Sequence, residues 1–186
     1  MNSPQFCIGT AKLGDRDYGF GSARSDRNIS DFLDKCRQLD IHNFDTSPRY
    51  GKSEKILGEY LTSLSNKKIF ISTKVDNLVA KNNKSEDKIK SSLENSLLNL
   101  NLNKINILYL HQNNLEIISD KFILNSLLRL KEQGYIESIG ASIYSEEELK
   151  FVIDCEIFDY VQIPINILDT YFYNVIIRSK SKIKIV

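Results

Sequence analysis

Cysteine is scarce in this 186-residue chain, and long apolar runs are absent. The three cysteines, Cys7, Cys36 and Cys155, form no Cys-x-x-Cys pair, which argues against a disulfide framework or a metal site and predicts buried thiols. No stretch approaches the roughly 20 apolar residues of a membrane-spanning helix. Residues 1–9 also lack the basic and apolar regions of a signal peptide. We therefore expect a cytoplasmic protein with no metal and no membrane attachment.

An excess of charge of either sign is also missing. The chain has 25 basic and 24 acidic residues, a formal net charge of +1, which argues against a nucleic-acid partner. Hydrophobic residues make up 41% and charged residues 26%, the balance of an ordinary globular protein. The length fits one well-buried core, so we expect a single domain over residues 1–186.

The chain does contain short apolar runs that alternate with longer stretches of helical periodicity. This alternation is typical of βα units with a parallel sheet. We expect strands at residues 6–9, 41–45, 68–73, 105–110, 135–140, 160–163 and 183–186.

Local signals mark where several of the intervening helices begin and end. Ser53 should cap the helix after the second strand with its hydroxyl. Gly134 is a natural left-handed end for the helix over residues 120–133. Ser145 and Glu148 have the spacing of a capping box for the next helix.

Six βα units and a seventh strand predict an α/β fold of the (β/α)8 TIM-barrel type, which typically needs about 250 residues. We therefore expect a truncated barrel. The rival fold is a doubly wound sheet, but the turn over residues 9–14 lacks the GxGxxG pattern that such a sheet uses to bind a pyrophosphate. An incomplete barrel leaves open sheet edges, which favour self-association.

Four proton-handling residues lie at or shortly after the ends of predicted strands: Asp45, Tyr50, Lys74 and His111. Each alone has a structural explanation, as a turn cap, a rim aromatic, a solvated lysine and a hydrogen-bonded histidine respectively. Reactive groups of βα barrels gather at the carboxyl ends of the strands. Their joint placement therefore predicts one catalytic site.

The segment over residues 43–58 resembles the signature of the aldo-keto reductases. The matching pieces are Asp45-Thr46-Ser47, Tyr50-Gly51, Ser53-Glu54 and Leu57-Gly58. Similar pieces follow along the chain at Gly9-Thr10 and over residues 72–74, 108–112, 138–142 and 161–163. The resemblance therefore covers essentially the whole chain.

This resemblance implies reduction of an aldehyde or ketone to an alcohol with NADPH or NADH. Tyr50 would be the general acid, Lys74 and Asp45 would tune it, and His111 would orient the carbonyl. The cofactor would contact Gly9, Thr10, Asp45, Ser142 and Gln162, and the substrate would contact Tyr18 and His111.

Some of the cofactor site implied by this resemblance differs or is missing. Ile143 stands where many members have Asn. The segment that binds the cofactor's phosphates would belong to the seventh and eighth units, so it is absent from this chain.

Two alternative functions remain at this stage. The first is a catalytically inactive barrel remnant that acts through protein contacts. The second is a Schiff-base aldolase that uses Lys74, but it leaves the position of Tyr50 unexplained.

Overall fold

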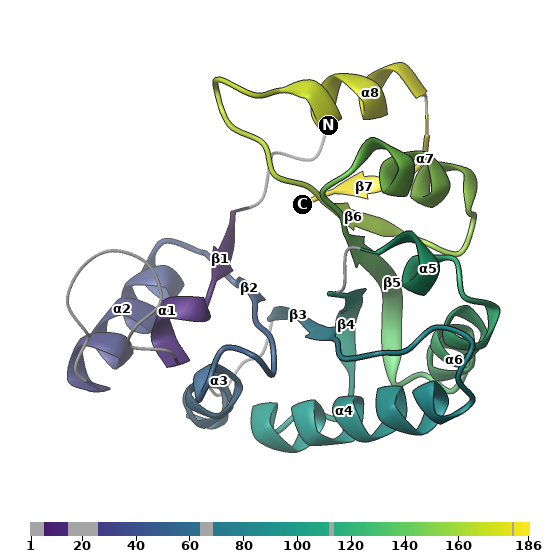
Figure 1. Ribbon diagram of the computed structural model, residues 1–186. Helices are drawn as coiled ribbons and strands as arrows, with labels where there is room; N and C mark the ends of the chain where they lie inside the picture. Colours follow the sequence, from purple (N-terminus) through teal and green to yellow (C-terminus); the bar gives the residue numbers. More distant parts are fainter. Residues whose placement is uncertain (1–5, 15–25, 64–68, 112–113, 180) are drawn as a thin grey trace. The chain divides into compact units, whose positions relative to one another are not determined.

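The computed structural model describes residues 6–14, 26–63, 69–111, 114–179 and 181–186 (Figure 1). Tyr18, the residue expected to contact substrate, lies outside these ranges. The strands of the described part follow one another in one sheet in sequence order, and the pairs β1–β2, β2–β3, β5–β6 and β6–β7 are parallel. They are β1 (Cys7–Gly9), β2 (Asn43–Asp45), β3 (Phe70–Val75), β4 (Ile105–Leu110), β5 (Ile136–Ser142), β6 (Tyr160–Gln162) and β7 (Lys184–Ile185).

Helices alternate with these strands, as the sequence pattern predicts. The helices are α1 (Ala11–Gly14), α2 (Asp26–Gln38), α3 (Ser53–Thr62), α4 (Lys84–Leu100), α5 (Leu115–Ile118), α6 (Lys121–Glu132), α7 (Glu146–Asp154) and α8 (Tyr171–Ser179). The longer helices α2, α3, α4, α6 and α7 each bury at least two apolar side chains, so tertiary packing stabilises them, whereas α8 buries only Ile176. None of the helices, within the described ranges, combines the length and apolar character needed to cross a bilayer.

The described residues form two compact units. The first unit comprises described residues within 1–73 and 93–106, and the second comprises those within 74–92 and 107–186. Leu33, Leu57 and Ile71 are among the core residues of the first unit, and Ile107 and Ile139 are among those of the second. Each unit therefore has its own buried apolar core.

Several local predictions are confirmed. The fourth strand runs from residue 105 to residue 110, as expected. Gly134 has a φ of 79°, the left-handed conformation predicted after α6. Ser145 and Glu148 make both hydrogen bonds of a capping box at the start of α7.

Three other local predictions are wrong. Ser53 is the first residue of α3, and Lys52 occupies the N-cap without a side-chain hydrogen bond. The third strand ends at Val75, so Lys74 lies within β3 rather than after it. Cys7 is exposed and Cys155 is partly exposed, so only Cys36 is the buried thiol that we expected.

Candidate functional site

In the first unit, the predicted site residues meet at the carboxyl ends of β1 and β2. Gly9 pairs with Asp45 across the two strands. The backbone N–H and the hydroxyl of Thr10 each donate to the carbonyl oxygen of Asp45 at 2.9 Å. The Asp45 carboxylate is buried and accepts a hydrogen bond from Ser72 Oγ at 2.8 Å. The backbone of Asp45 is therefore held from the end of β1, and its carboxylate is held from β3.

The turn that carries Tyr50 is fixed through its backbone. The Tyr50 N–H donates to the carbonyl of Ser47, and the Tyr50 carbonyl accepts from the Ser53 N–H, both at 3.0 Å. Tyr50 thus lies in a tight turn between β2 and α3.

A cluster of buried hydroxyl groups holds the end of this turn in place. Ser53 Oγ donates to the carbonyl oxygen of Thr10 at 3.0 Å and lies 2.6 Å from Thr10 Oγ1 and 3.1 Å from Thr46 Oγ1. The cluster joins β1, β2 and α3. Ser53 therefore makes long-range contacts in place of the helix cap that the sequence predicts.

Glu54 is a buried acidic residue next to this cluster. Its Oε1 accepts from Thr73 Oγ1 at 2.7 Å, and its Oε2 accepts from Asn99 Nδ2 at 3.3 Å. A buried carboxylate is tolerated when it accepts such hydrogen bonds. Glu54 therefore links α3 to β3 and α4 within the first unit.

In the second unit, Lys74 and His111 lie at the ends of neighbouring strands. The His111 N–H donates to the carbonyl oxygen of Val75 at 2.9 Å. Lys74 is only 2% exposed. A buried ammonium is costly unless it has a partner, so this lysine is not the solvated strand end of the structural explanation.

Asp76 is a residue of this region that the sequence pattern did not single out. Its Oδ2 lies 3.8 Å from His111 Nδ1, and its Oδ1 accepts a hydrogen bond from Asn77 Nδ2 at 2.9 Å. The closeness follows from the backbone hydrogen bond between His111 and Val75, the residue directly before Asp76. Only a strand alignment, rather than a motif, could have revealed it.

Ser142 and Gln162 end β5 and β6 and are aligned with each other. They are register partners, and the Ile143 N–H donates to the carbonyl oxygen of Gln162 at 3.0 Å. The Ser142 side chain is buried and that of Gln162 is partly exposed. A hydroxyl and an amide on neighbouring strand ends offer both donors and acceptors, which fits recognition of a carboxamide.

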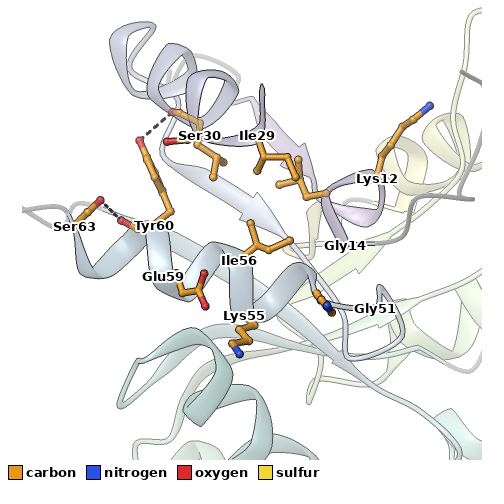
Figure 2. Close-up of a pocket in the computed structure, with 13 residues that line it drawn as sticks. Lys12, Gly14, Ile29, Ser30, Gly51, Lys55, Ile56, Glu59, Tyr60 and Ser63 are labelled. Atoms are coloured by element: carbon orange, nitrogen blue, oxygen red, sulfur yellow. Dashed lines mark hydrogen bonds between the residues drawn. The ribbon is translucent and has the colours of Figure 1, made fainter. Parts of the chain in front are cut away.

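A cavity of about 1070 Å³ lies among α1, α2 and α3 (Figure 2). Its wall includes Leu13, Ile29 and Ile56, and none of the predicted catalytic or cofactor residues lines it. Tyr60 in this wall donates to the carbonyl oxygen of Leu33 at 3.0 Å. Burial, followed by the charge of Asp34, raises the pKa of Tyr60. Gly51 and Lys52, which directly follow Tyr50, also line this cavity, so it borders the signature segment without including the nominated side chains.

The sequence of the chain matches a known protein family. The model of the aldo/keto reductase family matches residues 5–178. The chain belongs to this family. The predicted α/β fold of the (β/α)8 barrel type is thereby confirmed, because solved members of the family share it.

Curated relatives of this aldo/keto reductase include several oxidoreductases. An uncharacterised oxidoreductase of Mycobacterium bovis is 31% identical over 140 residues, which cover 74% of this chain and 42% of the relative. D-arabinose 1-dehydrogenase of Saccharomyces cerevisiae is 35% identical over 124 residues, which cover 62% of this chain and 36% of the relative. L-galactose dehydrogenase of Arabidopsis thaliana is 29% identical over 143 residues, which cover 73% of this chain and 44% of the relative. The chain thus spans less than half the length of these relatives.

Solved structures show the same kinship. A Pseudomonas aeruginosa protein provisionally assigned as an aldo-keto reductase has a TM-score of 0.79 at 25% identity, over 96% of this chain and 70% of that one. Glycerol dehydrogenase of Gluconobacter oxydans has a TM-score of 0.78 at 22% identity, over 100% and 60% of the two chains. The second likeness supports the fold alone.

Proposed function

We propose that this aldo/keto reductase chain carries the residues for NAD(P)H-dependent reduction of an aldehyde or ketone to an alcohol. The observation that best supports the proposal is the burial of Lys74, which is 2% exposed in β3. A lysine buried in this way suggests a functional role, because burial of an ammonium group lowers the stability of the fold unless another group compensates the charge. Membership of the aldo/keto reductase family suggests that this role is in carbonyl reduction.

Tyr50 is the proton donor in this proposal. A ketone needs a proton at oxygen as a hydride arrives at carbon, so an acid must stand within hydrogen-bond reach of that oxygen. A free tyrosine has a pKa near 10. The Lys74 ammonium favours the tyrosinate that forms, and the Asp45 carboxylate balances the ammonium.

His111 orients the carbonyl and shares the charge that develops on its oxygen. A donor already held in place at that oxygen stabilises the transition state without rearrangement. The backbone hydrogen bond from His111 to Val75 supports such a fixed position.

The cofactor is a nicotinamide dinucleotide, which supplies the hydride when it is bound. Ser142 and Gln162 fit its carboxamide, since a hydroxyl and an amide end neighbouring strands. Gly9, Thr10 and Asp45 complete the proposed contacts at the ends of β1 and β2.

Replacement of the proposed acid tests this function. The purified chain is assayed for NADPH and NADH oxidation with a panel of aldehydes, ketones and aldose sugars, the last suggested by the two sugar dehydrogenases among its relatives. We expect Tyr50→Phe to lower kcat by roughly 10²–10⁴-fold, the usual contribution of a general acid. Tyr144→Phe is the matched control, because Tyr144 is exposed and outside the proposed site. Full activity in Tyr50→Phe contradicts the role of Tyr50.

An inactive remnant that acts through protein contacts is the second candidate. It is favoured by Ile167 and Leu168, which are each 94% exposed in the second unit. Titration with NADPH and NADH, followed by nicotinamide fluorescence, separates the two candidates. A folded chain that binds neither nucleotide contradicts the reductase and leaves the remnant.

A further inference from the structure

The loop after β3 brings an acidic side chain to the edge of the His111 ring. Asn77 has a φ of 55°, a left-handed conformation that Asn tolerates better than most residues, so the chain turns directly after Asp76. Asn77 Nδ2 donates to Asp76 Oδ1 at 2.9 Å, which leaves Oδ2 facing His111 Nδ1 at 3.8 Å. The three residues form an ordered series from amide to carboxylate to imidazole.

The surroundings strengthen the effect of this carboxylate on the ring. The side chains of His111 and Asp76 are only 20% and 11% exposed, so water screens their interaction weakly. An opposite charge at this distance favours the protonated imidazole.

Other titratable side chains on the surrounding elements of the second unit contribute less or act in the opposite direction. Lys74 on β3 carries a positive charge, which opposes protonation of the imidazole. Tyr109 on β4 is buried, while Glu137 on β5 and Glu116 on α5 are exposed. Asp76 is therefore the acidic group that lies within ion-pair distance of this ring.

We propose that Asp76 is a positioning residue of the reductase site, which holds a proton on Nδ1 of His111 and turns Nε2 toward the carbonyl oxygen. The proposal rests on the carbonyl-orienting role of His111 in the proposed function. The distance of 3.8 Å between Asp76 Oδ2 and His111 Nδ1 is that of an ion pair, so Asp76 favours the proton on Nδ1 through its negative charge. With Nδ1 protonated, Nε2 donates a hydrogen bond only when the ring carries both protons.

This arrangement has a consequence for the pH dependence of the reaction. Reductive kcat/KM is expected to fall as pH rises through the pKa of His111, because the neutral ring then offers an acceptor at Nε2. Replacement of Asp76 by Asn removes the negative charge, so His111 loses its second proton at lower pH.

The chain is well suited to a direct measurement, because it contains only two histidines, His42 and His111. Their ¹⁵N-labelled imidazoles are titrated by NMR in the full chain without cofactor or substrate. We expect Asp76→Asn to lower the pKa of His111 by about one unit, a tenfold change in proton affinity. Asp40→Asn is the matched control, because Asp40 pairs with His42 at 2.9 Å in the first unit. It should change the His42 resonances and leave those of His111 unchanged.

Asp76→Glu and Asn77→Ala extend the test. The glutamate variant keeps the charge and should restore most of the shift, whereas Asn77→Ala frees Oδ1 and should lower the pKa of His111 by less than Asp76→Asn does. Above its pKa, wild-type His111 should show the ¹⁵N shifts of the Nδ1-protonated tautomer. The Nε2-protonated tautomer in the wild type, or an unchanged His111 titration in folded Asp76→Asn, overturns the proposal. Because no turnover is measured, this result is independent of the Tyr50 assay.

Discussion

Gly14, the last residue of α1, lies against the turn that carries Tyr50. A Cβ atom at Gly14 would stand 1.9 Å from the carbonyl oxygen of Tyr50 and 2.1 Å from the backbone nitrogen of Ser53. Neither backbone atom can move without shifting the turn or the start of α3. We expect Gly14→Ala to lower the free energy of unfolding by about 1–3 kcal/mol, the usual range for an overpacked site, as measured by urea unfolding.

Gly9→Ala is the control for this prediction. A Cβ at Gly9 would meet nothing within 4 Å, although Gly9 is only five residues away along the chain. Both variants reduce the freedom of the unfolded chain in the same way. Equal stability of Gly14→Ala and Gly9→Ala would show that the close approach at Gly14 is relieved without cost.

The sequence identified single site residues better than it identified their partners. Asp45, Thr10 and Gly9 stand together at one pair of strand ends, and their positions follow from a motif. Asp76 escaped notice because its closeness to His111 depends on the backbone hydrogen bond between His111 and Val75, a long-range contact that no local pattern contains. Serine is a residue type suited to a helix cap, but the hydroxyl of Ser53 instead donates a hydrogen bond to the buried hydroxyl of Thr10 at 2.6 Å.

At the scale of elements, Asp120 connects two segments of the second unit. As the N-cap of α6, its Oδ1 accepts from the N–H groups of Phe122 and Ile123 at 2.9 and 3.0 Å. Its Oδ2 accepts from the Lys81 N–H at 2.6 Å. We expect Asp120→Ala to destabilise the protein by about 2 kcal/mol, because it removes a cap with two hydrogen bonds and also the acceptor of the Lys81 N–H.

The N-cap of the neighbouring short helix provides the comparison. Asn114 caps α5 with one hydrogen bond, to the N–H of Glu116 at 2.8 Å, and is exposed. Asn114→Ala should therefore cost about 0.5–1 kcal/mol in the same chemical unfolding experiment. A loss in Asp120→Ala no larger than that in Asn114→Ala would contradict the bridging role of Asp120.

The length of an element decided how well the sequence predicted it. The strand β4 follows from an apolar run of six residues, and the helix α6 follows from its helical period and from Gly134 after it, and both are confirmed. The helices α1 and α5 were missed, since four residues are too few to show a helical period. The end of β3 was placed two residues early because Lys74 is polar in sequence yet buried in the structure.

At the scale of the molecule, the described strands run from β1 to β7 in sequence order. The match to known proteins covers most of this chain but only 36–44% of the curated relatives. The fold class could be predicted because the βα alternation repeats along the whole chain. The side chains proposed to contact cofactor and substrate come from the ends of several strands, so their geometry depends on tertiary structure rather than on a motif.

An exposed apolar patch on the chain favours its self-association. Ile167 and Leu168, in the segment between β6 and α8, are each 94% exposed, and Ile165 and Tyr171 beside them are about half exposed. Neighbouring apolar side chains on a surface favour contact with another protein molecule. We expect sedimentation velocity to show association that increases with protein concentration.

Substitution of Ile167 and Leu168 by Ser should shift this equilibrium toward the monomer by at least tenfold in dissociation constant. Removal of two large apolar side chains from a contact weakens it by more than about 1.4 kcal/mol, the free energy of that factor. Leu98→Ser is the control, because Leu98 is 79% exposed on α4 and is a single exposed apolar residue of a kind that is common on protein surfaces. A wild-type chain that stays monomeric at every concentration, or a Leu98→Ser effect as large as that of the double variant, contradicts an association surface at residues 165–168. The double variant lies outside the proposed catalytic residues, so its activity also shows whether association is needed for turnover.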